Sequence, residues 1–381
     1  MGDVTGFLRR LLGGGEAPVD VPDAASIADP EARARDAWRI LHDTSMVRRG
    51  GNQLLVMDGP GRHSGIAAVW PLSQVLAAAL DLARLEVGKP DGDGGHGGAA
   101  LVETLAETLE LYRWGDGYAP YPGSQERYFD DNAWVGLDAM QGHVQLPGRP
   151  ADSLWLHKAK RTFGVVVGGQ DDDGGVRWKE GPAGRPGSRN SCSTAPAVEL
   201  ALRLHAATGA DRHREVAERA DAWLWRELAS PDGLLWDHVD PDGSVERTVW
   251  SYNQGAAIGA DVLWWRLSAD RRRLDRAVAT AAAALDHFAV DDGLWTQPPA
   301  FNAIFFRNLL QLHAAEPQPR VVAELDRYLE RVWNEARRAD DGRFTGGGIG
   351  HYDGGGSLDH AALVQLFALQ AFPADALPDV S

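Results

Sequence analysis

The sequence predicts an all-α protein whose helices form an (α/α)6 barrel. Apolar residues recur with helical spacing along nearly the whole chain. Long and short breaks alternate between the helical segments, and each long break carries an Asp-Gly pair, which indicates an internal repeat. The chain has 381 residues, enough for one large domain with a substantial core.

Twelve helical segments are expected, separated by stretches rich in Gly, Asp and Pro. No segment has the alternating pattern of a long strand, and residues 165–167 (Val-Val-Val) and the ends of some loops are expected to form short strands at most. The predicted helices lie near residues 30–46, 69–86, 98–113, 129–145, 151–167, 190–208, 211–229, 250–268, 271–289, 301–315, 318–338 and 357–372.

The long breaks set the repeat. They lie near residues 47–68, 114–128, 168–189, 230–249, 290–300 and 339–356, and their Asp-Gly aspartates are 58, 57, 59, 60 and 49 residues apart. Two helices and one long loop therefore form a unit that occurs six times. Because a helical hairpin cannot bury its apolar face alone, the hairpins must pack on one another. A closed barrel is preferred to an open solenoid because the final segment, 357–372, is apolar rather than a polar cap.

The inner helices of the barrel are expected to follow the long loops. Residues 76–80 (Leu-Ala-Ala-Ala-Leu) and 255–260 (Gly-Ala-Ala-Ile-Gly-Ala) have the small apolar side chains of closely packed inner helices. Since consecutive helices run antiparallel, the long loops and the N-termini of the inner helices should meet on one face. A ligand site is expected there, because the polar motifs of the chain collect at these helix starts.

Composition excludes several classes of protein. Lys plus Arg is 38 and Asp plus Glu is 54, a formal charge of −16, and no basic stripe is visible, so a nucleic-acid partner is not expected. Cys192 is the only cysteine, which excludes an intramolecular disulfide and a thiolate metal cluster. No metal-binding or phosphate-loop motif occurs, and we expect no cofactor and no metal.

The N-terminal segment is expected to be mobile, unlike the rest of the chain. Residues 1–28 are predicted to be a mobile N-terminal arm, and residues 29–381 a single barrel domain. The arm has no convincing signal peptide and no apolar run approaches the length of a membrane span, so a cytoplasmic location is expected, with export by another route left open.

Residues 128–134 (Tyr-Phe-Asp-Asp-Asn-Ala-Trp) are the strongest candidate for chemistry. Aspartates at a helix start often serve as caps, which is the alternative interpretation. Adjacent residues on a helix point about 100° apart, so the carboxylates of Asp130 and Asp131 can flank one sugar ring. Retaining glycoside hydrolases use two carboxyl groups about 5 Å apart. The 14 tryptophans add weight, since aromatic faces stack on sugars, although some are expected only to fix the loops.

Two blocks of sequence resemble glycoside hydrolase family 76, the endo-α-1,6-mannanases. Residues 128–134 resemble the Asp-Asp motif of that family, and residues 251–255 (Ser-Tyr-Asn-Gln-Gly) resemble its Thr-Tyr-Asn-Gln-Gly block. Residues 274–277 and 305–307 follow in the expected order, and the resemblance spans roughly residues 30–372. Val135 replaces a usual aromatic, and Ser251 replaces the usual Thr.

This resemblance implies a barrel that hydrolyses α-1,6-mannosidic bonds with retention of configuration. Asp130 would be the nucleophile and Asp131 the general acid/base. The expected partner is an oligo- or polysaccharide of the α-mannan type. The candidate sugar contacts, some from the motifs and some from their place in the loops, are Tyr128, Asn132, Trp134, Trp178, Asn190, Asp237, Tyr252, Asn253, Gln254, Trp295 and Arg307.

Two other functions remain open from sequence. A sugar epimerase or isomerase of the same fold would use histidines of the loop face, such as His351 or His360, as proton carriers. A catalytically silent barrel would bind or organise glycans without cleaving them. Substitution of the histidines tests the first alternative, and binding without product formation would indicate the second.

Overall fold

The computed structural model describes residues 27–49, 53–59, 65–86, 98–146, 153–181, 187–344 and 356–373. All but the last two residues of the predicted N-terminal arm lie outside the described residues. Within the described residues, no helix is long and apolar enough to cross a membrane.

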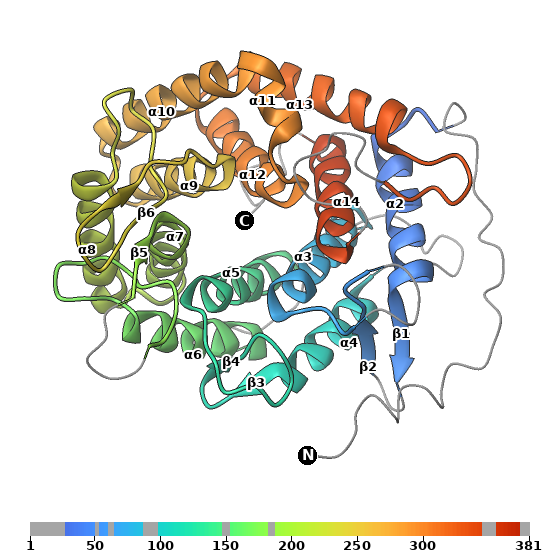
Figure 1. The fold of residues 1–381 in the computed structure, drawn as a ribbon, viewed down its shortest axis with the longest axis horizontal. Helices are drawn as coiled ribbons and strands as arrows, with labels where there is room; N and C mark the ends of the chain where they lie inside the picture. Colours follow the sequence, from blue (N-terminus) through green and yellow to red (C-terminus); the bar gives the residue numbers. More distant parts are fainter. Residues whose placement is uncertain are drawn as a thin grey trace.

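Six helices form an inner ring (Figure 1). Each contacts the next in chain order, and the last contacts the first, which closes the ring and confirms the barrel over the open solenoid. The inner helices are α3 (Val69–Glu86), α5 (Phe129–Gln145), α7 (Ser191–Thr208), α9 (Ser251–Ser268), α12 (Pro299–Ala315) and α14 (Ser357–Ala371).

Six further helices form an outer ring. They are α2 (Pro30–Ser45), α4 (Ala99–Leu109), α6 (Leu154–Gly168), α8 (Asp211–Glu227), α10 (Arg271–Ala289) and α13 (Pro319–Arg331). Five of them pack on the inner helix that precedes them in the chain, and α2 packs on α14 and so joins the two ends of the barrel (Figure 1). Inner and outer helices alternate along the sequence as predicted, and every inner helix follows a long loop.

Side-chain burial explains which helices lie inside. Nearly every residue of α3 is buried, as expected of a helix that is apolar on most of its circumference. The outer helix α13 instead buries one stripe, formed by Val321, Leu325, Tyr328 and Leu329, and exposes its charged face. The apolar pattern of each helix therefore matches its place in the two rings.

Two glycines allow α9 and α12 to pack closely. A Cβ atom on Gly255 would lie 2.6 Å from the Cα of Phe305, and one on Gly259 would lie 1.9 Å from Oδ1 of Asn308. A larger residue at position 255 would push the helices apart, and one at position 259 would displace the Asn308 side chain. The Gly- and Ala-rich run of residues 255–260 thus belongs to a tightly packed inner helix, as the sequence predicted.

Short antiparallel strands decorate the long loops. They are β1 (Met46–Arg49) with β2 (Gln53–Val56), β3 (Arg113–Trp114) with β4 (Gly117–Tyr118), and the three-stranded set β5 (Arg189–Asn190), β6 (His238–Val239) and β7 (Val245–Glu246). Short helical pieces also occur, namely η2 (Glu110–Tyr112), η3 (Val290–Asp292), α11 (Gly293–Thr296) and η4 (Val332–Ala336). Residues 165–167 are not a strand: they end α6, where Val165 and Val166 are buried on its apolar stripe.

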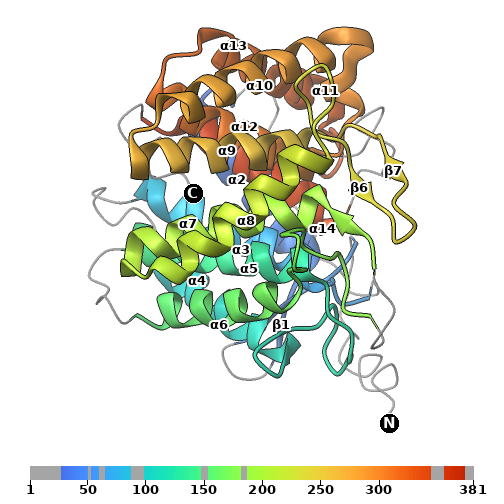
Figure 2. The ribbon, with the colours of Figure 1, turned by 90° about the vertical axis from the view of Figure 1, so that its left-hand side faces the viewer.

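The long loops that precede the inner helices lie at one end of the barrel, where the β6–β7 hairpin protrudes in Figure 2. Several predicted Asp-Gly pairs form turns there, and Gly174 and Gly233 adopt the left-handed φ values of 107° and 80° that favour glycine. The loop end therefore gathers the N-termini of the inner helices, as the repeat predicted.

Candidate active site

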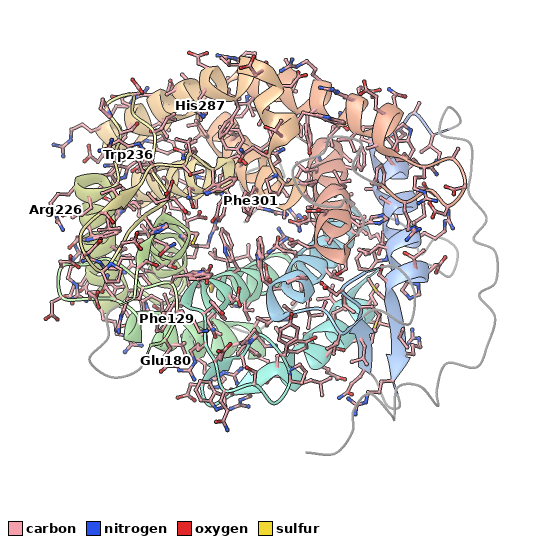
Figure 3. All side chains as sticks on the ribbon, viewed as in Figure 1. Phe129, Glu180, Arg226, Trp236, His287 and Phe301 are labelled. Atoms are coloured by element: carbon pink, nitrogen blue, oxygen red, sulfur yellow. The ribbon has the colours of Figure 1, made fainter. Side chains whose placement is uncertain are left out.

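A cavity of about 510 Å³ opens at the loop end, a size typical of ligand sites. The starts of five inner helices and the loops between them contribute to it. Figure 3 shows Phe301 at the inner ring, whereas Arg226 and His287 lie on the outer ring. The cavity is lined by Trp70, Tyr128, Asp130, Asp131, Trp134, Trp178, Ser188, Asn190, Cys192, Asp237, His238, Tyr252 and Phe301.

The start of α5 is fixed by the loop that follows α6. The Phe129 amide donates to the carbonyl oxygen of Trp178 at 2.9 Å, and the Phe129 ring packs so closely on Gly169 that a Cβ there would meet it at 2.6 Å. Phe129 is buried beneath the loops in Figure 3. This anchoring sets the direction of the two residues that follow, Asp130 and Asp131, both of which line the cavity.

Asp130 is surrounded by neutral donors. Its Oδ2 accepts a hydrogen bond from Trp178 Nε1 at 3.0 Å and a longer one from Cys192 Sγ at 3.7 Å. Burial raises the pKa of Asp130 to about 6, although the backbone amide of Asp131 and the Trp178 indole oppose that rise by stabilising the charged form. Asp130 therefore remains mostly ionised at neutral pH.

Asp131 has different surroundings. Among the described residues, no hydrogen bond reaches its carboxyl group. Burial, and then the neighbouring charge of Asp130, raise the pKa of Asp131 well above its usual range. The two carboxyl groups therefore differ in their surroundings at one helix start: hydrogen bonds favour the charged form of Asp130, and the neighbouring charge disfavours that of Asp131.

The capping interpretation holds only in part. The N-cap residue of α5 is Tyr128, and its side chain makes no capping hydrogen bond. The first-turn amides of Asp130 and Asp131 stabilise the Asp130 charge, as in an ordinary helix start. Asp131 receives no such support within the described residues, so capping does not explain the pair.

A third carboxylate, Asp237, lines the same cavity. Its Oδ1 accepts from Asn253 Nδ2 at 3.4 Å, and its Oδ2 lies 3.0 Å from Nδ1 of His238. Asn253 comes from the first turn of α9, and Asp237 from the loop before it. The Tyr-Asn-Gln-Gly block therefore contributes to the site partly by holding Asp237 in place.

Aromatic rings form much of the cavity wall. Tyr252 stacks on Phe301 with ring centroids 4.0 Å apart and planes at 21°, and Trp70 lies against the same ring at 6.2 Å. Tyr128 meets Trp178 edge to face at 5.1 Å. Such walls suit the apolar faces of sugar rings, and the carboxylates between them supply the polar contacts.

Six of the eleven predicted sugar contacts line the cavity. They are Tyr128, Trp134, Trp178, Asn190, Asp237 and Tyr252. These residues stay candidates for direct contact with a ligand.

Three other predicted contacts are fully buried, and two of them bond backbone groups of the long loops. Asn132 bonds the amide and carbonyl of Tyr118 at 2.8 and 3.0 Å, and Gln254 does the same for Leu235 at 2.8 and 2.9 Å. Asn253 acts through Asp237. Their amide side chains fasten the long loops to the inner helices, which gives them a positioning role rather than a place on the cavity wall.

Two predicted contacts lie elsewhere and are corrections. Trp295 faces a separate small pocket with Tyr328, where Arg331 lies 4.0 Å from its ring centre. Arg307 is buried inside the barrel, where Nη1 donates to Asp81 Oδ1 at 3.1 Å and Nη2 also bonds Asp81. Arg307 lies in the middle of α12 rather than at its start, and Trp295 lies in the short helix α11 before α12, and neither lines the cavity.

Five cavity residues escaped the sequence-based assignment: Trp70, Ser188, Cys192, His238 and Phe301. Trp70 and Phe301 lie in the first turns of inner helices, and Ser188 and Cys192 flank the start of another. The sequence placed the site at the starts of the inner helices, so these four residues could have been predicted from their positions. His238 follows Asp237 directly and carried no other signal.

The histidines named for epimerase chemistry do not support that alternative. His360 is 4% exposed and packs edge to face on Phe344, away from the cavity. Burial lowers the pKa of His360 to about 4. His351 lies outside the described residues. In the part of the chain that the structure describes, no group of three or more His, Cys, Asp or Glu side chains could hold a metal ion.

An (α/α)6 barrel with neighbouring carboxyl groups in its cavity is typical of one class of glycoside hydrolases. The family model for glycosyl hydrolase family 76 matches residues 51–378, and the chain belongs to this family.

Solved structures share the fold. A family 76 glycoside hydrolase from a bovine Bacteroides thetaiotaomicron strain superposes with a TM-score of 0.78 at 22% identity, covering 92% of this chain and 78% of the other. An inactive variant of an α-1,6-mannanase from Salegentibacter sp. HEL1_6, with two consecutive Asp-to-Asn substitutions and bound α-1,6-mannotriose, gives 0.71 at 19% identity over 90% and 99% of the two chains.

One curated relative also matches. A mannan endo-1,6-alpha-mannosidase of Candida albicans is 29% identical over 173 residues. The match spans 42% of this chain and 38% of the relative, so the chain covers well under two thirds of the relative's length.

Proposed function

We propose that the protein hydrolyses α-1,6-mannosidic bonds of a mannan-type glycan with retention of configuration. The observation that carries the proposal is the neighbouring pair Asp130 and Asp131, which line one aromatic-walled cavity in contrasting surroundings. Asp130 acts as the nucleophile, and Asp131 as the general acid and then base. A carboxylate and a carboxylic acid side by side are what such a mechanism requires at its start.

The hydrogen bonds support this division of roles. Trp178 stabilises the ionised form of Asp130, so that it is available to attack the anomeric carbon. The Asp130 charge keeps the proton on Asp131, which can pass it to the leaving oxygen. Once Asp130 forms the glycosyl bond its charge is gone, the pKa of Asp131 falls, and Asp131 becomes the base that activates water.

The mannan specificity rests on similar proteins. The Candida relative acts on mannan, and the Salegentibacter mannanase was inactivated by changing two consecutive aspartates, the same arrangement as Asp130 and Asp131. The choice of sugar and linkage is therefore the part of the proposal that experiment must test first.

Incubation with linear α-1,6-mannan tests the proposal, with α-1,6-glucan as the control that keeps the linkage and changes the sugar. We expect short mannooligosaccharides from the mannan alone, and an α-anomer as the first product by time-resolved NMR. Cleavage of the glucan at an equal rate would refute the sugar specificity, and a β-anomer would refute retention. Mannan binding in calorimetry without any product would indicate the silent barrel.

The cytoplasmic location stays a prediction from the sequence. Fractionation of cells that make the full-length protein, with immunodetection in each fraction, tests it directly. Detection outside the cytoplasm would overturn it and would give the enzyme access to envelope or extracellular glycans.

A further inference from the structure

The only cysteine of the chain lies beside the proposed nucleophile. Cys192 is the second residue of α7, is 5% exposed and lines the cavity. Its Sγ lies 3.7 Å from Asp130 Oδ2, within the range of a hydrogen bond from sulfur. The same oxygen accepts the Trp178 indole N–H at 3.0 Å, so two donors from different elements converge on it.

Tyr252 of α9 faces the same cavity as the thiol. Its ring is held by stacking on Phe301 at 4.0 Å. Tyr252, Cys192 and Asp130 come from α9, α7 and α5, so three inner helices contribute to the surroundings of the proposed nucleophile.

The burial of one Asp130 oxygen indicates which of the two can react. Asp130 Oδ1 is enclosed by protein atoms and, among the described residues, has no hydrogen-bond partner. Asp130 nevertheless lines the cavity, so Oδ2 is the oxygen that can reach a sugar. Cys192 and Trp178 therefore donate their hydrogen bonds to the oxygen atom that would attack the sugar. A thiol is a weak donor, which can orient this oxygen without binding its charge as firmly as a hydroxyl would.

We propose that Cys192 is a positioning residue that orients Oδ2 of Asp130 for attack. Its place in catalysis rests on the function proposed above, but the contact itself can be tested without any enzymatic activity. The titratable groups that face Asp130 and the thiol across the cavity are Asp131 on α5, Tyr252 on α9, Tyr128 before α5, and Asp237 and His238 in the loop before α9.

The first test uses the reactivity of the thiol. Burial, and then the charges of Asp130 and Asp237, raise the pKa of Cys192 well above its usual range, and only the thiolate reacts with iodoacetamide. Because the chain has one cysteine, intact-mass spectrometry of the full-length protein reports its alkylation alone. We expect Asp130→Asn to speed alkylation at pH 8 by about threefold or more, since half a pKa unit corresponds to that factor.

Asp131→Asn is the matched control, since it makes the same Asp-to-Asn change at the adjacent residue, whose carboxyl group has no hydrogen bond to the thiol among the described residues. A smaller acceleration than in Asp130→Asn supports the contact. Equal rates in the two variants, or no acceleration in either, would overturn it. This readout does not depend on mannanase activity, so failure of the proposed function would leave the test intact.

The second test uses the pH profile of kcat/KM. Cys192→Ala removes a donor to the charged form of Asp130, so its acidic limb should move up by about half a pH unit, with kcat lowered more than KM is raised. Cys192→Ser keeps a donor, but its shorter C–O bond leaves the hydroxyl farther from Oδ2, so its limb should lie between those of the other two proteins. Superimposable profiles for all three would refute the positioning role.

Discussion

The cavity and the interior of the barrel both bury carboxyl groups, but they treat them differently. Below the cavity, Asp81 is held by both Arg307 Nη atoms and by Gln141 at 2.7 Å, and Glu199 lies 3.8 Å from Arg203. In the cavity, Asp130 has only neutral donors and Asp131 has none among the described residues. A neighbouring cation would neutralise the charge that a catalytic carboxylate needs. A buried structural carboxylate, in contrast, needs such a cation to remain charged.

The comparison also shows why a perturbed pKa does not by itself identify an active site. Burial raises the pKa of Glu199 to about 8 and that of Asp138 well above its usual range, although neither lines the main cavity. Asp130 and Asp131 differ from Glu199 and Asp138 because they line the cavity. Among the described residues, they also have no cationic partner.

The largest expected effect concerns two aspartates on the same helix. Asp130→Asn and Asp131→Asn should each lower kcat/KM on α-1,6-mannan by about 10³-fold or more, because each removes one half of the carboxyl pair. Asp138→Asn, on the same face of α5 about two turns deeper, should keep activity within about threefold, since Asp138 lies outside the cavity and burial raises its pKa well above its usual range.

Circular dichroism and thermal unfolding should show that all three variants remain folded. A loss of activity in Asp138→Asn as large as in the other two would break the distinction between the cavity and the interior.

The next effect concerns stability. Arg307→Met should lower the free energy of unfolding by about 3–5 kcal/mol, because it leaves Asp81 buried without its cation. Arg214→Met, which removes an exposed partner of Glu218 on α8, should cost less than about 1 kcal/mol. Urea denaturation measures both. A raised KM for mannan in Arg307→Met, without loss of stability, would restore Arg307 as a sugar contact.

Helical periodicity and the spacing of the long loops were sufficient to predict the double ring, because each helix carries its own apolar pattern. The same argument located the carboxyl pair at the loop end. It failed for Arg307 and Trp295 because neither lies at the start of an inner helix: Arg307 is in the middle of α12, and Trp295 is in α11. The partner of Arg307 is Asp81, which is far away in the chain, so only the packing of the helices shows that pairing.

Asn132 and Gln254 show a second limit. Their motifs were recognised, but an amide next to a catalytic residue can contact the sugar or fix a loop. Only the bonds to Tyr118 and Leu235 decide between these roles. Short-range sequence carries the identity of such residues, and long-range packing decides their function.

The pH dependence of activity should follow from the two surroundings. The proposed mechanism needs Asp130 ionised and Asp131 protonated, and burial raises both pKa values, that of Asp130 to about 6. The rate of mannan cleavage should therefore fall on the acidic side as the nucleophile takes up a proton, about tenfold per pH unit below 6. It should fall again at higher pH as Asp131 loses its proton.

The two limbs belong to the pair because the groups are coupled. Arg307→Met should leave both limbs in place, since Arg307 pairs with Asp81 and not with the cavity carboxylates. A shift of either limb in this variant would show that the interior network tunes the site.

The smallest expected effect separates two tryptophans that sequence treated alike. Trp178→Phe removes the indole N–H that stabilises ionised Asp130, so the pKa of Asp130 should rise and the acidic limb of kcat/KM should move up by about half to one pH unit. Trp295→Phe is the control, because that indole lies in the separate pocket beside Tyr328 and its loss should leave the limb where it is. Since Phe keeps the aromatic face in both variants, stacking is largely preserved and the shift reports the hydrogen bond. An equal shift in both would mean that loop packing, and not the N–H donor, sets the ionisation of the nucleophile.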